Sequence, residues 1–183
     1  MLDIGCGDGG LLLRLRNKYR EVWGIDIAQP RIDRIQKKFG NESNIHIRVE
    51  DINEKIDFED GFFDTITVVS VLEHVFDPYH LIRECHRLLC VGGCLIVQVP
   101  NVANAPNRMR LLIGKLPVTT DNLEGEGWDG GHLHYFTRAS LKKLFENEGF
   151  KVIKVTNGGI FARQRRVCGS LLGADILVVG IKE

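Results

Sequence analysis

The stretch that decides the fold is MLDIGCGDGG, residues 1–10, at the start of the chain. Its first four residues are mostly apolar and predict a short strand, whereas residues 5–10 predict a glycine-rich turn. Leu11, Leu12 and Leu15 follow at helical spacing and predict a helix. Glycines allow a ligand to approach the backbone closely, and the first turn of a helix offers N–H groups and a partial positive charge. The stretch therefore predicts a ligand site between strand and helix.

Downstream of this turn, short apolar segments alternate with amphipathic ones, which is typical of an α/β fold with a mostly parallel sheet. Further strands are predicted over residues 21–25, 45–49, 63–69, 94–99, 151–156 and 176–181, with the last two as a pair at one edge. Helices are predicted to begin near Pro30 and after the N-caps Asp77 and Thr137. The second of these three is predicted to end at Gly92 and Gly93.

One segment does not follow this alternation of apolar and amphipathic stretches. Residues 101–136 are rich in Asn, Gly and Pro, with a possible short helix over residues 108–113. The chain of 183 residues suits one domain, so we interpret residues 1–183 as a single domain and residues 101–136 as an insertion within it. The insertion follows the fifth strand, at the edge of the sheet where ligands bind, and we predict that it is an acceptor-binding lid.

Composition limits the classes of partner. Apolar residues make up 44% of the chain, and the formal net charge is zero, so no basic face for nucleic acid is expected. The dense basic run Arg163, Arg165 and Arg166 is interpreted as a solvated loop. No apolar run reaches the roughly 20 residues that a membrane span needs. We therefore expect neither a nucleic acid nor a membrane as partner.

The cysteines and the first residues of the chain indicate the cellular compartment in which we expect the protein. Five cysteines without a CxxC pair disfavour a disulfide framework or a zinc knuckle and indicate a reducing, cytoplasmic setting. Met1 leads directly into the first predicted strand, so we expect no signal peptide. We also expect either that a preceding helix is missing or that the gene begins late.

Two nucleotide cofactors are compatible with the glycine turn. Gly5, Gly7 and Gly10 match the G-x-G-x-x-G dinucleotide fingerprint. Asp26 stands at the tip of the next strand, at about the spacing used to bind ribose hydroxyls. The preceding Asp3 favours S-adenosylmethionine over NAD, because its carboxylate suits a cationic amino group and would repel a pyrophosphate.

The third and fourth strands add to this preference. Asp51 follows the third strand and can accept a hydrogen bond from an adenine amino group, and Ile27 and Ile52 can flank the ring. Residues 70–75 (SVLEHV) follow the fourth strand, where the sulfonium end of the cofactor is expected.

Four segments carry a family resemblance. DIGCGDG (3–9), GID (24–26), VEDI (49–52) and SVLEHV (70–75) resemble the successive motifs of class I S-adenosylmethionine-dependent methyltransferases of the type 11/23 group. The resemblance implies a Rossmann-like, doubly wound seven-stranded sheet of order 3-2-1-4-5-7-6 with the last strand antiparallel. It also implies direct methyl transfer to a small-molecule acceptor. The cofactor-binding residues that we predict are Asp3, Gly5, Cys6, Gly7, Gly9, Asp26, Ile27, Asp51, Ile52 and Ser70.

Two other functions remain open. Residues 99–101, 110–119 and 132–137 resemble MetW-like proteins of methionine biosynthesis. This resemblance implies a non-catalytic S-adenosylmethionine-binding partner of a homoserine acyltransferase. A nicotinamide-dependent oxidoreductase is the remote alternative, disfavoured because no Tyr-x-x-x-Lys pair is present and because Asp3 and Asp51 would have no role.

The catalytic candidates lie in and near the insertion. We predict His132, His134 and Tyr135 as catalytic residues, with His74 as a further candidate base, because histidine titrates near neutral pH. The pair Glu73-His74 resembles a metal-binding pair of relatives that carry another carboxylate three residues earlier, where this chain has Ser70. Two ligands make a poor site for a hard cation, so we expect no metal.

Overall fold

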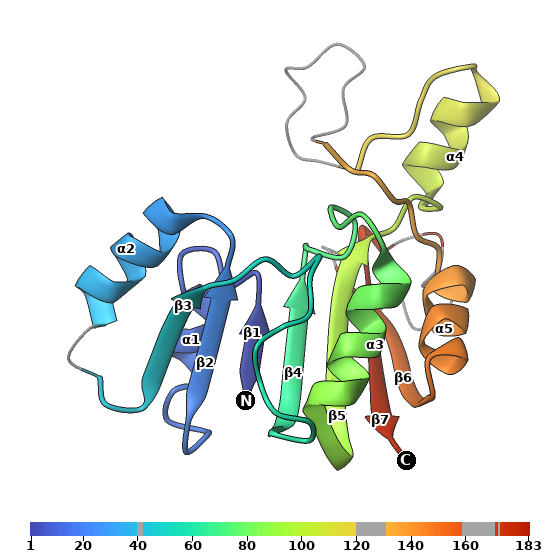
Figure 1. Cartoon of the computed structure of the whole chain (residues 1–183). Helices are drawn as coiled ribbons and strands as arrows, with labels where there is room; N and C mark the ends of the chain where they lie inside the picture. Colours follow the sequence, from blue (N-terminus) through green and yellow to red (C-terminus); the bar gives the residue numbers. More distant parts are fainter. Residues whose placement is uncertain (40–41, 120–130, 159–170, 172) are drawn as a thin grey trace.

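The chain folds around a seven-stranded mixed sheet (Figure 1). The computed structural model describes residues 1–39, 42–119, 131–158, 171 and 173–183. Within these residues the strand order is β3-β2-β1-β4-β5-β7-β6. The strands are β1 (Leu2–Ile4), β2 (Val22–Asp26), β3 (Ile45–Val49), β4 (Phe63–Val69), β5 (Leu89–Pro100), β6 (Phe150–Gly158) and β7 (Asp175–Lys182).

The pairing of the strands confirms the predicted topology. The strands β1 to β5 pair in parallel, and β7 pairs antiparallel with both β5 and β6. The antiparallel strand therefore inserts between β5 and the edge strand β6, as the resemblance implied.

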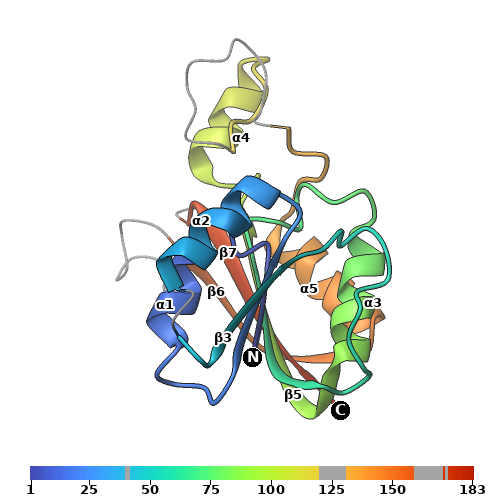
Figure 2. The same ribbon diagram turned by 60° about the vertical axis from the view of Figure 1, so that its left-hand side comes forward.

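Helices cover both faces of the sheet (Figure 2). The helices α1 and α2 lie on one face, and α3 and α5 lie on the other. Each face buries its own apolar cluster, the smaller one around Leu12, Ile32 and Ile35 and the larger one around Ile82 and Phe145. The helices are α1 (Gly10–Leu15), α2 (Gln29–Phe39), α3 (Pro78–Leu88), α4 (Ala105–Leu112) and α5 (Arg138–Asn147).

Two predicted N-caps are present. The Asp77 side chain accepts hydrogen bonds from the backbone N–H groups of Tyr79 and His80, with Pro78 as the first residue of α3. The Thr137 side chain accepts from the backbone N–H of Ser140, whose own side chain returns a bond to the backbone of Thr137. Both caps satisfy N–H groups that a helix start would otherwise leave unpaired.

The predicted end of α3 is wrong. The helix ends at Leu88 and not at Gly92 and Gly93, because Leu89 is extended and already pairs with Phe63 of β4. The next pair in the register joins Thr65 to Cys94. Between these two pairs β5 contains more residues than β4, which produces a bulge. Gly92 and Gly93 lie in this irregular part of β5 and do not form a helix C-cap.

The helix in the insertion also differs from its predicted range of 108–113. It begins at Ala105 because the Asn104 side chain caps it by accepting a hydrogen bond from the backbone N–H of Asn107. Pro106 lies in its first turn, where no N–H partner is needed. Figure 1 shows α4 standing beyond the end of the sheet, away from the helices that cover its faces.

Gly24 of β2 provides a test of the packing under the glycine turn. A Cβ atom at this position would lie 2.6 Å from Cδ1 of Leu12 and 3.0 Å from Sγ of Cys6. We expect Gly24→Ala to lower the free energy of unfolding by about 1–3 kcal/mol, because overpacking forces neighbours to shift. Chemical denaturation measures the change.

Gly10→Ala is the matched control, since a Cβ atom there meets nothing within 4 Å. We expect it to change the free energy of unfolding by less than about 1 kcal/mol. An equally stable Gly24→Ala variant would show that β2 and α1 are not packed as described.

Candidate functional site

The carboxyl ends of the first four strands meet at one edge of the sheet. In the register, Ile4 of β1 lies opposite Ile25 of β2 and Val68 of β4, and Ile25 lies opposite Arg48 of β3. The segments that follow these strands therefore begin side by side. The strand order reverses between β1 and β4, which is where ligands bind in open α/β sheets.

The glycine turn after β1 combines close packing with open space. Gly5, Gly7 and Gly9 all have positive φ, at 71°, 55° and 73°. A Cβ atom on Gly5 would lie 2.2 Å from Cγ2 of Val71, and one on Gly9 would lie 3.1 Å from the Phe39 ring, whereas one on Gly7 would meet nothing within 4 Å. A side chain would thus clash at Gly5 and be crowded at Gly9, whereas the space beside Gly7 is open to a ligand.

The carboxylate of Asp26 is fixed beside this turn. Its Oδ2 accepts a hydrogen bond from the backbone N–H of Gly7 at 3.0 Å, and its Oδ1 accepts from that of Ala28 at 2.9 Å. The Arg31 guanidinium lies 3.7 Å from Oδ2. Because each carboxylate oxygen can accept a further bond, the arrangement suits the hydroxyl groups of a ribose.

Asp3 lies in β1 behind the turn and is buried, with 4% of its surface exposed. Burial raises the pKa of Asp3 to about 6, although the Thr67 hydroxyl donates a hydrogen bond of 2.7 Å to its Oδ1 and partly offsets the rise. The charge of Asp26 raises the pKa further. A cationic ligand beside Asp3 would stabilise the ionised form.

The Cys6 side chain turns away from this edge. It belongs to the smaller apolar cluster and packs against Gly24, and burial raises its pKa to about 12. A thiol of this kind is an inert packing group. Any contact of Cys6 with a cofactor would come from its backbone.

Two of the three residues predicted to surround the adenine are exposed at the same edge, and the third is half-buried. Asp51 is exposed, and its Oδ1 accepts bonds from the backbone and side-chain N–H groups of Asn53, both at 3.0 Å. Ile27 is 63% exposed, and Ile52 is half-buried against the larger cluster. The exposed isoleucine offers an apolar surface to a ring.

A strained residue marks the end of β4. Ser70 has a φ of 54°, and among the described residues it alone has a positive φ without being glycine. Its backbone N–H donates to the carbonyl of Gln98 at 3.0 Å. Such strain is found mainly where a functional site constrains the backbone.

A distant segment of the chain lies against the loops after β4 and β5. The backbone N–H groups of Leu133 and His134 donate to the carbonyl of Glu73 at 2.8 and 3.1 Å, and Phe136 forms a bridge with Asn101. The end of the insertion is therefore part of the carboxyl edge.

The predicted histidines share one side of this segment. His132 and His134 are half-buried, whereas Leu133 and Tyr135 are exposed. Nδ1 of His132 lies 2.7 Å from the Thr119 hydroxyl. The rings of His132 and His74 are 4.6 Å apart, and Nε2 of His134 lies 3.3 Å from the carbonyl of Phe76. Both imidazoles thus reach the loop that follows β4.

The sequence singled out Glu73 only as half of a possible metal-binding pair with His74, and it did not predict that this carboxylate is buried. Glu73 is 1% exposed, and neither of its carboxylate oxygens has a hydrogen-bond partner among the described residues. Burial raises its pKa to about 7. Its flanking apolar residues Leu72 and Val75 are both buried, and this was the one signal that could have indicated a buried carboxylate.

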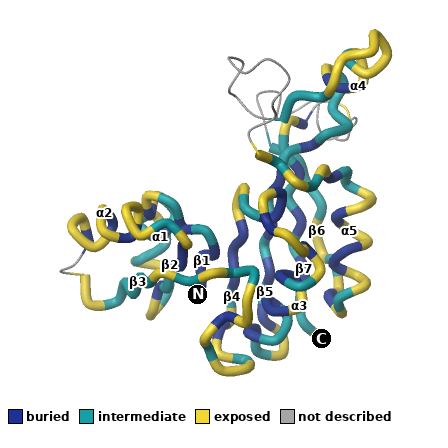
Figure 3. The backbone as a smooth tube through the Cα atoms, turned by 45° about the horizontal axis from the view of Figure 1, so that its top comes forward, coloured by how far each residue is buried: buried dark blue, intermediate teal, exposed yellow. Residues whose placement is uncertain are grey.

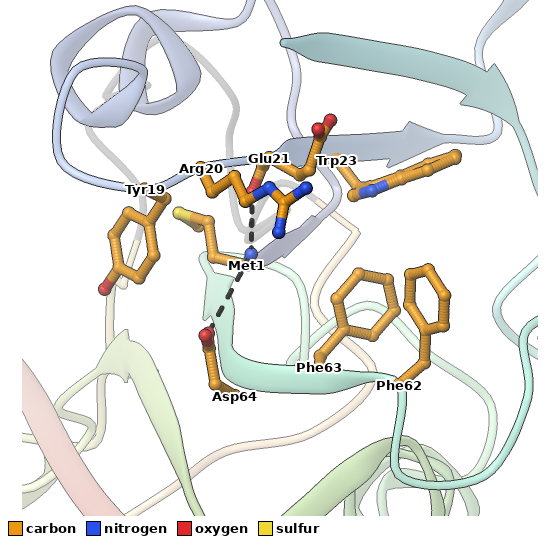
Figure 4. Close-up of a pocket in the computed structure, with 8 residues that line it drawn as sticks. All are labelled: Met1, Tyr19, Arg20, Glu21, Trp23, Phe62, Phe63 and Asp64. Carbon is orange, nitrogen blue, oxygen red and sulfur yellow. Dashed lines mark hydrogen bonds and ion pairs between the residues drawn. The ribbon is translucent and has the colours of Figure 1, made fainter.

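A hollow of about 350 Å³ lies at the opposite, amino end of the strands (Figure 4). Its lining includes Tyr19, Trp23 and Phe62, and the Met1 amino group lies 3.9 Å from Oδ1 of Asp64. The hollow surrounds the start of β1 and is separate from the carboxyl edge.

The insertion presents an apolar surface beyond the site. Figure 3 colours much of α4 as exposed, and the exposed side chains of α4 and its C-cap include Met109, Leu112 and Ile113. No helix in the described ranges is long and apolar enough to cross a membrane. Three parts of the sequence analysis fall outside the described residues: the basic run Arg163, Arg165 and Arg166, one of the five cysteines, Cys168, and residues 120–130 of the predicted lid.

Comparisons with known proteins agree with this geometry. A family model described as a methyltransferase domain matches residues 1–155. A ubiquinone biosynthesis O-methyltransferase from Xanthomonas oryzae pv. oryzae (strain PXO99A) is 36% identical over 103 residues, which cover 55% of this chain and 43% of that protein. The match thus spans less than half of the relative.

Solved structures share the fold. An S-adenosylmethionine-dependent methyltransferase from Methanosarcina mazei aligns with a TM-score of 0.74 at 24% identity, covering 99% of this chain and 91% of the other. A possible histamine N-methyltransferase from Thermotoga maritima aligns with a TM-score of 0.72 at 20% identity, covering 100% and 81%. With its family match over residues 1–155 and this fold, the chain belongs to the methyltransferase domain family, whose cofactor is S-adenosylmethionine.

Proposed function

We propose that this protein transfers the methyl group of S-adenosylmethionine to an oxygen atom of a small-molecule acceptor. The observation that carries the proposal is the meeting of two sets of residues at one sheet edge. The glycine turn, Asp3 and Asp26 lie at the ends of β1 and β2, and the half-buried His132 and His134 reach the loop after β4.

In the proposal, the chain's own residues hold the cofactor by charge and shape. The buried Asp3 faces the cationic amino group of the methionyl moiety, and the open backbone at Gly7 allows a close approach. Asp26 accepts from the ribose hydroxyls, and Asp51 accepts from the adenine amine. Ile27 and Ile52 flank the ring, and Cys6 contributes through its backbone.

S-adenosylmethionine supplies a methyl group already activated by the sulfonium: the S–C bond breaks as the acceptor O–C bond forms, and the neutral thioether leaves. The protein then has to align the acceptor and exclude water. An imidazole near neutral pKa suits the task of receiving the acceptor's proton. In the proposal the half-buried His134 takes this role, and the exposed Tyr135 is its neighbour in the chain.

Two observations support an acceptor that has an apolar body and is methylated on an oxygen atom. Residues 101–136 would act as the lid, and the described part of this segment exposes Leu111, Leu112, Leu133 and Tyr135, which suits an acceptor with an apolar body. The partial similarity to an O-methyltransferase of ubiquinone biosynthesis supports an oxygen as the atom that is methylated.

Turnover tests this proposal against the non-catalytic alternative. The full chain is incubated with S-adenosylmethionine and a panel of phenols with apolar substituents, and S-adenosylhomocysteine is quantified by chromatography. We expect acceptor-dependent release of S-adenosylhomocysteine. We expect His134→Asn to lower kcat by about 10²–10⁴-fold, the usual contribution of a general base, without changing the affinity for S-adenosylmethionine.

His80→Asn, which alters a histidine on α3, is the matched control and keeps the wild-type rate. Binding of S-adenosylmethionine without release of product for any acceptor would instead support a MetW-like partner protein, whose expected companion is an acyltransferase.

The pH dependence of cofactor affinity tests the role of Asp3. Its pKa of about 6 in the free protein means that a growing fraction is neutral as the pH falls below 6, and a neutral acid binds an ammonium group weakly. We expect the affinity for S-adenosylmethionine, measured by calorimetry between pH 7 and pH 5, to fall by up to about tenfold per pH unit below 6.

Asp3→Asn is the control for this measurement. We expect it to bind the cofactor more weakly at pH 7 and with little dependence on pH. A wild-type affinity that stays constant from pH 7 to pH 5 would remove Asp3 from contact with the amino group.

A further inference from the structure

Three side chains that commonly bind metals come together beside the predicted acceptor position. Glu73 and His74 lie in the loop after β4, and His132 lies in the segment before α5. One ligand atom from each of the three lies within 4.8 Å of the others. The sequence placed only two of these groups together, because His132 is far along the chain.

The carboxylate of Glu73 lacks a partner in the protein. Both of its oxygens are buried without a hydrogen bond among the described residues, and the residue is 1% exposed. No ion pair to Glu73 occurs in the described part of the chain. Buried carboxylates in proteins are usually paired with a cation or coordinate a metal. A cation bound beside Glu73 would therefore be stabilised by its carboxylate.

The two imidazole rings are oriented by neighbouring oxygen atoms. Nδ1 of His132 lies 2.7 Å from the hydroxyl of Thr119, and Nδ1 of His74 lies 3.4 Å from the carbonyl of Gly131. Histidines that bind metals characteristically have one ring nitrogen held by such an oxygen, which sets the tautomer and the orientation of the ring.

The backbone also fixes the two segments relative to each other. The carbonyl of Glu73 accepts hydrogen bonds from the N–H groups of Leu133 and His134. The ligand on the far segment is thus attached next to the two ligands on the loop after β4.

We propose that Glu73, His74 and His132 bind a divalent transition-metal ion. Two imidazoles and one carboxylate form a donor set that suits zinc, iron or cobalt, whereas magnesium and calcium prefer oxygen ligands. Zinc bonds of about 2.0–2.1 Å place tetrahedral donors roughly 3.4 Å apart, so the cluster must contract moderately to close around the ion. Three protein ligands leave one coordination position open, as in catalytic zinc sites.

The proposal departs from the expectation of no metal drawn from the sequence. That expectation rested on a hard cation, for which Ser70 is the wrong residue. The structure adds a nitrogen ligand and thereby changes the class of ion. The ion would fasten residues 131–134 to the loop after β4, and this binding does not depend on methyl transfer.

Titration of the metal-free full chain with Zn²⁺ and with Co²⁺ tests the site without any adenosyl ligand. We expect calorimetry to show one ion bound per chain, Co²⁺ to develop the visible absorption bands of a protein site, and Zn²⁺ to raise the Tm. Magnesium at the same concentration should leave the Tm unchanged. We expect Glu73→Gln and His132→Asn each to weaken binding by more than about 100-fold, since even the loss of an outer-shell partner costs 10–100-fold.

His46→Asn is the matched control, because His46 lies on β3 with its own carboxylate partner, Glu21, at 2.6 Å, and it should bind metal as the wild type does. Circular dichroism establishes that each variant is folded. If Glu73→Gln fails to fold, His74→Asn replaces it, since the His74 side chain is exposed. The proposal is overturned if the wild type shows no saturable binding, or if folded variants of the three ligands bind as tightly as the wild type.

Discussion

The close contact between Gly5 and Val71 joins the two halves of the site. Val71 occupies the space that a side chain at position 5 would need, only 2.2 Å from an ideal Cβ atom. Gly5 begins the glycine turn, and Val71 belongs to the loop that carries Ser70, Glu73 and His74. A larger residue at position 5 would therefore displace both the glycine turn and the loop after β4. The short strand β1 alone, with three residues, could not fix their relative position.

Two buried carboxylates give the site its electrostatic character. Asp3 and Glu73 are 4% and 1% exposed, and burial is the largest cause of the raised pKa of each. A buried acid with a raised pKa is stabilised when a cation approaches. The two acids lie on either side of the point where the strand order reverses, one suited to an ammonium group and the other to a metal ion. We therefore expect bound cations, and not side chains of the protein, to neutralise these two carboxylates.

Local signals in the sequence were sufficient for much of the fold. Asp77 and Thr137 cap their helices as predicted, since an N-cap depends on neighbouring residues only. The strand order came from the family resemblance and was confirmed by the pairing. The end of α3 could not be read locally, because the pairing of Leu89 with Phe63 overrides the glycines that follow. The meeting of Glu73 with His132 is a tertiary contact, and no periodicity in the chain encodes it.

The central claim is that the carboxyl edge holds S-adenosylmethionine. Thermal unfolding with S-adenosylmethionine, S-adenosylhomocysteine and NADH in parallel tests it most directly. A ligand at about 100 times its Kd adds roughly 2.7 kcal/mol to the free energy of unfolding, which for a domain of this size raises the Tm by about 5–10 °C. We expect this rise with the two adenosyl ligands and none with NADH. A rise with NADH alone would show that the glycine turn binds a dinucleotide and not S-adenosylmethionine.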